Sequence, residues 1–102
     1  MAYFGILEFM KARMKINVPV SYFKEDKSFV AYTPALDLSS AGKTLKEAEK
    51  NIAEAVSIFM EEILIHGTVD EVLSSLGWKK ISKTSQWMPP IFVSHGMLPV
   101  TV

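Results

Sequence analysis

The chain has 102 residues, of which 49% are hydrophobic and 22% are charged. This length fits one domain, and this composition argues against a disordered or fibrous protein. Eleven basic residues balance eleven acidic ones, so the chain lacks the overall positive charge that favours nucleic-acid binding. The absence of cysteine excludes disulfides, thiolate nucleophiles and zinc-thiolate sites, and it suits a cytoplasmic protein.

The chain is predicted to contain one domain with a short extension. Residues 1–13 are expected to form an N-terminal extension, and residues 14–102 a single α/β domain that ends in a strand segment. The opening stretch is apolar, but Glu8 interrupts it and no basic region precedes it, which argues against a secretory signal. No stretch reaches the ~20 apolar residues that span a bilayer, so we expect no membrane contact.

Three strands are predicted before the first helix. Residues 15–23 alternate between apolar and polar positions, which is typical of a half-buried strand. A charged connection leads to a second β-favouring run at 28–33, which Pro34 ends. Residues 38–42 are predicted as a short third strand, and three antiparallel strands in a meander are the simplest arrangement.

A long helix is predicted to begin after Thr44. Glu47 follows three residues later and completes a capping box, in which side chains satisfy the free amides of the first turn. Apolar residues then recur at spacings of three and four as far as Ile63, so one face of this helix is expected to pack on the sheet. Gly67 is predicted to stop the helix in a left-handed conformation.

A shorter second helix is predicted between Thr68 and Gly77. Thr68 and Glu71 repeat the capping-box pattern. If Gly77 ends the helix in a Schellman motif, Trp78 and Leu73 occupy the two positions whose apolar contact accompanies that motif. The sequence therefore predicts a structural role for Trp78.

The C-terminal part is predicted as a loop followed by strand. Residues 79–86 are polar, and Pro89 and Pro90 exclude a helix at that point. Residues 91–94 and 98–102 favour a second hairpin or one strand with a bent tail. The whole order predicts an α+β fold: a three-stranded antiparallel meander followed by a long and a short helix and a C-terminal strand or hairpin, with the helices on one side of the sheet.

The middle of the chain carries a recognisable pattern, in which a strand ends near a proline, a short strand contains glycine, and threonine opens a helix. Residues 29–62 read FVAYTPALDLSSAGKTLKEAEKNIAEAVSIFMEE. The positions that carry the pattern are Pro34, Gly42, Thr44, Glu47, Ala48, Asn51 and Ala55, and the short helix continues it with Leu76, Gly77 and Trp78. In these residues the chain resembles the HicB-like antitoxin family, although Ala35, Leu36, Asp37 and Leu38 depart from the family's usual segment.

The resemblance implies a degraded ribonuclease-H-like or double-stranded-RNA-binding-like fold without catalysis of its own. It also implies that the chain neutralises a small HicA-type mRNA-cleaving toxin by protein–protein contact. Many relatives carry a DNA-binding segment behind this domain, but the residues after Trp78 lack the pattern of two further helices. This argues against DNA binding by the chain alone.

The residues themselves suggest no enzyme, metal site or cofactor. His66 lies in the last turn of the long helix, where a positive charge complements the helix dipole. His95 lies in a predicted turn without another ligand at a metal-binding spacing. Glu61 and Glu62 are adjacent on a helix, so their carboxylates diverge and are expected to lie on a solvated face.

We predict that Tyr32, Leu36, Asp37 and Ser39 bind the partner. The long helix commits its apolar face to the sheet, whereas the ends of the second and third strands can contact another chain. Asp37 is expected to face the basic surface of an RNA-cleaving partner, with Leu36 as an apolar anchor. The solvated side of the long helix around Glu54 and Glu61 is the alternative interface.

Two further expectations concern other partners. A stand-alone interaction or RNA-binding module is the alternative function, because aromatic residues on two strands could imitate a base-stacking sheet: Tyr22, Phe23, Phe29 and Tyr32. A homo-oligomer is expected as well, because the apolar extensions at 1–10 and 97–102 supply more hydrophobic surface than one small sheet covers.

Overall fold

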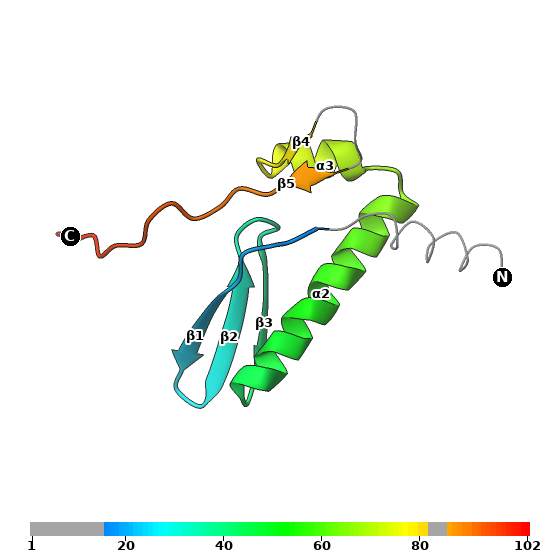
Figure 1. Ribbon diagram of the computed structural model, residues 1–102. Helices are drawn as coiled ribbons and strands as arrows, with labels where there is room; N and C mark the ends of the chain where they lie inside the picture. The colour runs from blue at the N-terminus through cyan, green and yellow to red at the C-terminus, as the bar shows by residue number, and fades with distance from the viewer. Residues whose placement is uncertain (1–15, 82–85) are drawn as a thin grey trace.

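The computed structural model describes residues 16–81 and 86–102 of the chain (Figure 1). The predicted extension at residues 1–13 lies outside the described residues. The described elements are, in chain order, β1 Ser21–Glu25, β2 Ser28–Thr33, β3 Leu38–Gly42, α2 Leu45–Ile65, α3 Val69–Ser75, β4 Lys79–Lys80 and β5 Trp87–Met88.

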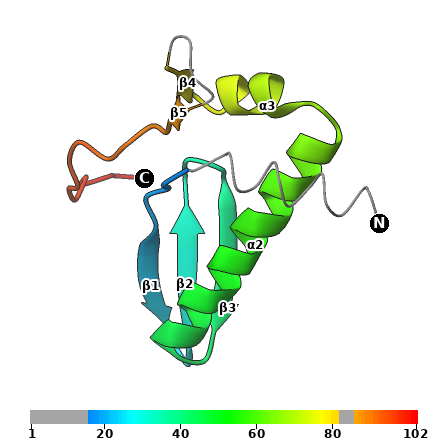
Figure 2. The same ribbon diagram turned by 45° about the vertical axis from the view of Figure 1, so that its right-hand side comes forward.

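The three long strands form an antiparallel sheet in the order β1-β2-β3, and β4 pairs with β5 in a second, two-stranded sheet. The long helix α2 packs along the first sheet, while α3 and the β4–β5 ladder lie beyond the far end of α2 (Figures 1 and 2). The predicted α+β class, with a meander, a long helix, a short helix and a C-terminal hairpin, is confirmed. No helix in the part of the chain that the structure describes is long and apolar enough to cross a membrane.

The meander is built by two different turns. Asp26 and Lys27 connect β1 to β2, and Asp26 has a φ of 48°, a left-handed conformation that aspartate adopts more readily than most residues. Residues 34–37 connect β2 to β3, and Asp37 at the end of this turn has a φ of 53°. The first strand begins at Ser21, later than the predicted residue 15, since Pro19 has no amide hydrogen to donate to a ladder.

The long helix begins as the sequence predicts. The Thr44 hydroxyl accepts a hydrogen bond from the Glu47 amide at 3.1 Å. The start of the helix lies very close to β3, because a Cβ added to Gly42 would come within 2.6 Å of the Ala48 nitrogen. The side-chain amide of Asn51 donates to the Ala41 carbonyl at 2.7 Å, which fastens the second turn of α2 to the edge of β3.

Both helices end in the predicted glycine motif. Gly77 has a φ of 90°, and the Trp78 amide donates to the Leu73 carbonyl at 2.9 Å, which is the long bond of a Schellman motif. The equivalent bond at the end of α2 runs from the Thr68 amide to the Ile63 carbonyl at 2.9 Å. Thr68 makes no side-chain cap for α3, so the second predicted capping box is wrong. Its ψ of 18° departs from the extended backbone that a capping residue needs.

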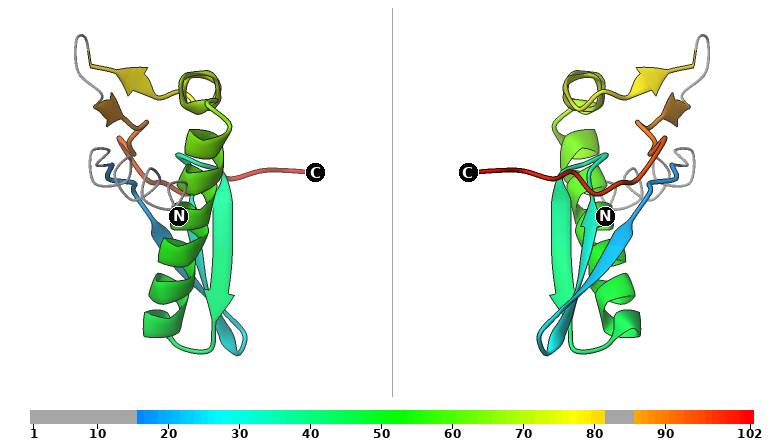
Figure 3. Two further views of the ribbon diagram at one scale, coloured as in Figure 1. Left: turned by 90° about the vertical axis from the view of Figure 1, so that its right-hand side faces the viewer. Right: turned by 90° about the vertical axis from the view of Figure 1, so that its left-hand side faces the viewer.

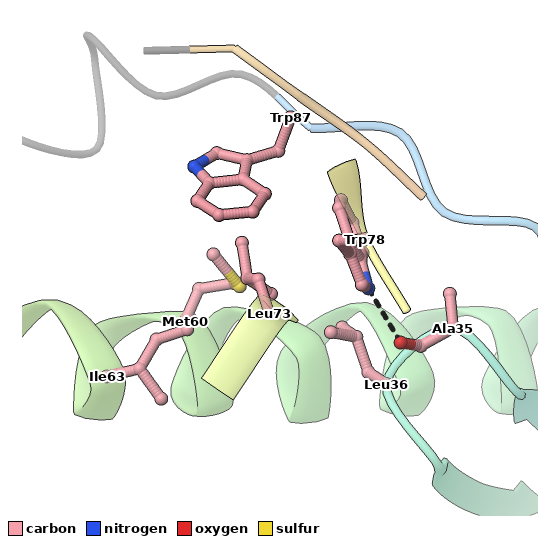
Figure 4. Close-up of a cluster of buried hydrophobic side chains, with 7 residues drawn as sticks. All are labelled: Ala35, Leu36, Met60, Ile63, Leu73, Trp78 and Trp87. Carbon is pink, nitrogen blue, oxygen red and sulfur yellow. Dashed lines mark hydrogen bonds between the residues drawn. The ribbon is translucent and has the colours of Figure 1, made fainter. Parts of the chain in front are cut away.

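A cluster of buried side chains joins the β2–β3 turn to the two helices and to the β4–β5 ladder (Figure 4). Its members come from the β2–β3 turn, α2, α3 and the region around β4 and β5: Ala35, Leu36, Met60, Ile63, Leu73, Trp78 and Trp87. The Trp78 indole N–H donates to the Ala35 carbonyl at 2.7 Å, and both residues are buried. The predicted structural role of Trp78 is therefore confirmed.

The C-terminal hairpin lies earlier in the chain than predicted. The ladder pairs Lys79 with Met88 and Lys80 with Trp87, so its first strand falls within the predicted loop at 79–86, and residues 91–102 contain no strand. Burial of Trp87 in the core cluster explains the difference, because it holds residues 87 and 88 beside the end of α3. The polar composition of residues 79–86 predicts a loop, but burial of the single Trp87 indole stabilises a short ladder there instead.

Candidate partner-binding surface

The strand register divides the sheet into two faces. Ala31 is fully buried and packs with Ala48 and Ile52 of α2, so it marks the helix side. Side chains alternate along a strand, and residues directly opposite each other share a face. The centre of the side away from α2 therefore carries five residues, which we call the open face: Phe23, Val30, Tyr32, Ser39 and Ala41. Ser21, Glu25 and Ser28 lie on the same side at its margins.

The five residues of the open face are uncharged, but Glu25 lies on the same side of the sheet at the end of β1, two residues from Phe23. Phe23 pairs with Val30 across β1 and β2, and Val30 pairs with Ala41 across β2 and β3. The Phe23 side chain is 50% exposed, and Ser39 and Ala41 are exposed on β3, on the other side of β2. Phe23 is the large apolar side chain that this face exposes most, and its partner Val30 is half-buried.

Tyr32 connects the open face to the β2–β3 turn. Its hydroxyl donates a hydrogen bond to the Asp37 carboxylate at 3.0 Å. This hydrogen bond raises the pKa of Tyr32 above its ordinary value of 10.0, and partial desolvation and the negative charge of Asp37 act in the same direction. Asp37 is exposed, so one end of the apolar face carries an accessible negative charge held in place by a tyrosine.

Three of the four predicted partner-binding residues share this surface. Tyr32 and Ser39 lie opposite each other on the open face, and Asp37 lies at its end. Leu36 does not belong to it, because its side chain is only 2% exposed and lies in the core cluster. The predicted role of Leu36 as a surface anchor is therefore wrong. The tight turn, with its Leu36 amide 3.4 Å from the Thr33 carbonyl, directs this leucine inward.

Phe23, Val30 and Ala41 belong to the open face but were not predicted to bind a partner. The sequence contains the relevant signal in its period-two alternation, but alternation alone does not tell which of the two faces a helix covers. The packing of Ala31 against Ala48 and Ile52 decides that question. The candidate apolar anchor is accordingly Phe23 and not Leu36.

The aromatic residues that suggested an RNA-binding sheet are divided between the two faces. Phe23 and Tyr32 lie on the open face, whereas Tyr22 and Phe29 lie on the helix side. The Lys24 ammonium lies 5.8 Å from the centre of the Phe29 ring, so it also points to the helix side. Since β1, β2 and β3 place no lysine or arginine on the open face, this face lacks the cations that a phosphate backbone requires.

Among the residues that the structure describes, the remaining polar groups do not converge on a second site. His66 lies 3.2 Å from the Glu62 carboxylate one helical turn away, and both side chains are exposed. The His95 ring contacts the Phe92 ring at a centroid distance of 4.7 Å. No cluster of three or more potential metal ligands occurs within residues 16–81 and 86–102.

The fold is that of a small α+β protein, and no described residue covers the central part of the sheet side away from α2. Comparison with protein-family models, with curated proteins and with solved structures gives no match for this chain. The HicB-like resemblance therefore depends on the motif residues alone.

Proposed function

We propose that the chain is an antitoxin-like binding protein that neutralises a HicA-type mRNA-cleaving toxin by covering the toxin's RNA-binding surface. The single observation that supports this proposal most directly is the open face with Asp37 at its end. An RNA-cleaving partner needs a basic surface, and a fixed carboxylate beside an apolar patch complements such a surface. A degraded ribonuclease-H-like or double-stranded-RNA-binding-like origin of the fold is part of the same proposal.

The parts of this surface have different roles. Phe23 is the apolar anchor, because it offers the largest exposed aromatic side chain on the open face. Asp37 supplies charge complementarity, which mainly speeds association and selects a basic partner. Tyr32 fixes the carboxylate through its hydroxyl, so that less side-chain freedom is lost when the partner binds.

The test measures binding to the protein encoded by the neighbouring reading frame with isothermal titration calorimetry. Ser39→Arg introduces a long cation into the open face at an exposed position, and Glu54→Arg places the same side chain on the exposed side of α2. Ser39→Arg is expected to weaken binding at least tenfold, which is about 1.4 kcal/mol, while Glu54→Arg leaves the affinity within twofold. The opposite pattern would move the interface to α2, and absence of binding by the unmodified chain would contradict the proposed function.

An RNA-cleavage assay with the same proteins provides a functional readout. Cleavage of a messenger RNA by the partner should stop when the unmodified chain is added in equimolar amount, and it should continue in the presence of the Ser39→Arg variant. Far-ultraviolet circular dichroism of both variants provides the control for folding. Inhibition that is equally strong with Ser39→Arg would contradict the assignment of the open face.

A further inference from the structure

The last twelve residues of the chain are unusual for an exposed segment. Residues 91–102, which we call the C-terminal arm, contain no Asp, Glu, Lys or Arg. Six of its apolar side chains are at least 70% exposed: Ile91, Val93, Met97, Leu98, Val100 and Val102. The arm contains neither helix nor strand, and it runs away from the rest of the molecule (Figure 1). So much contiguous apolar surface marks a segment that binds another surface.

The arm leaves the molecule close to one end of the sheet. Its first residues, Ile91 and Phe92, line a hollow of about 250 Å³ together with Pro90 and with Pro34 and Ala35 of the β2–β3 turn. Beyond this hollow the chain crosses over, and its red end lies on the side of the sheet away from α2 and clear of the sheet (Figure 3). The arm thus leaves Phe23 on its own sheet half-exposed.

The end of the arm has the pattern of an extended apolar strand. Leu98, Val100 and Val102 alternate with Met97, Pro99 and Thr101, so three apolar side chains share one side of an extended backbone. Pro99 disfavours a helix and fixes its own φ in a range that an extended segment accepts. Because residues 91–102 contain neither helix nor strand, no secondary structure has to unfold before their apolar side chains contact another surface.

The arm and the open face match in charge and in length. Neither the arm nor the five residues of the open face include a lysine, arginine, aspartate or glutamate, and Glu25 and Asp37 lie at the two ends of the face, where a bound arm can leave them in solvent. The ten residues beyond Phe92 reach up to ~33–36 Å when extended, whereas strands of five or six residues are ~17–20 Å long. The arm can therefore pass from its hollow to a neighbouring molecule and still run along a whole sheet.

We propose that the C-terminal arm of one copy packs on the open face of a second copy, and that the two copies exchange arms in a symmetric dimer. Each chain carries one arm and one open face, so reciprocal exchange satisfies both apolar surfaces and closes the assembly at two chains. The proposal gives the expected homo-oligomer a specific interface. It does not depend on the proposed toxin partner, because a second copy of the chain is the occupant.

Sedimentation velocity of the full chain between 1 and 100 µM tests the dimer. The unmodified chain is expected to sediment as a dimer at 10 µM. Leu98→Asp in the arm and Phe23→Lys on the open face should each raise the dimer dissociation constant at least tenfold, because each places a charge in an apolar contact. Ile58→Asp provides the matched control, since Ile58 is an exposed isoleucine on α2 outside both surfaces, and it should leave the dissociation constant unchanged.

Mixing the two charged variants tests whether the arm meets the open face. In the mixed dimer the arm of the Leu98→Asp chain packs on the open face of the Phe23→Lys chain, so the introduced carboxylate lies opposite the introduced ammonium. The second arm and the second open face are unmodified, and the mixture should therefore form a dimer that neither variant forms alone.

Dimerisation of the mixture would confirm a contact between arm and face. A monomeric unmodified chain at 100 µM, an unaffected Leu98→Asp variant, or a mixture that stays monomeric would each overturn the proposal.

Discussion

The hydrogen bond between the Trp78 indole and the Ala35 carbonyl allows a quantitative test of how the β2–β3 turn is held to the end of α3. The bond measures 2.7 Å, lies in the core cluster and connects residues that are 43 positions apart in the chain. In Trp78→Phe the ring stays aromatic and apolar, but the donor is lost and the buried carbonyl of Ala35 loses this partner. We expect this substitution to lower the free energy of unfolding substantially.

The expected magnitude has two parts. Replacing an indole by a phenyl ring removes roughly 40 Å² of buried apolar area, or about 1 kcal/mol at ~25 cal/mol per Å². Leaving a buried carbonyl unsatisfied adds about 1–3 kcal/mol. The sum of about 2–4 kcal/mol is a large share of the ~5–15 kcal/mol that stabilises an ordinary domain.

Trp87→Phe is the matched control, because Trp87 is buried in the same cluster and the described residues show no hydrogen bond from its indole (Figure 4). It should cost only the area contribution of about 1 kcal/mol. Urea denaturation followed by far-ultraviolet circular dichroism measures both variants without depending on tryptophan fluorescence. Equal costs for the two substitutions, or a larger cost for Trp87→Phe, would refute the assigned role of the hydrogen bond.

Three further substitutions test other features of the fold. Gly42→Ala should destabilise the chain by about 1–3 kcal/mol in urea denaturation, because its Cβ would come within 2.6 Å of the α2 backbone, whereas Gly96→Ala has open space and should change stability by less than about 0.5 kcal/mol. Thr33→Val should raise the free energy of unfolding by about 1 kcal/mol, because the buried Thr33 hydroxyl has no hydrogen-bond partner in the described part of the chain; a destabilised variant would contradict this. Tyr32 should ionise above pH 10.0 in an absorbance titration, and Tyr32→Phe should remove that late transition. Because its pKa is raised in the folded chain, its contribution to stability is present below pH 10.0 and is lost as the pH rises through the folded pKa.

The sequence predicted the elements whose signals are local. The Thr44 cap is visible because the capping residue and Glu47 lie three positions apart and bond directly to each other. The Gly77 motif is visible for the same reason, since all its hydrogen bonds fall between Leu73 and Trp78. These features depend on a few adjacent residues, so no knowledge of the tertiary structure is needed to find them.

The predictions that failed depend on contacts distant in sequence. Leu36 lies in a turn that was expected to be exposed, but Trp78 and the end of α3 cover this turn and bury the leucine. Trp87 similarly converts a polar stretch into a short ladder by entering the same cluster. Part of the candidate site was found because Tyr32 and Asp37 are only five residues apart, whereas Phe23 becomes part of it only through the pairing of β1 with β2.

The two proposals assign different occupants to one surface, and this has a consequence for affinity. An arm from a second copy and a toxin-like partner would both cover Phe23 on the open face, so they exclude each other there. The apparent dissociation constant for the partner then equals the intrinsic one divided by the fraction of open faces that are free of arms. At concentrations well below the dimer dissociation constant the arms are released and the full affinity is available. If both proposals hold, the arm protects an apolar face while the chain lacks a partner, and it raises the partner concentration at which the face becomes occupied.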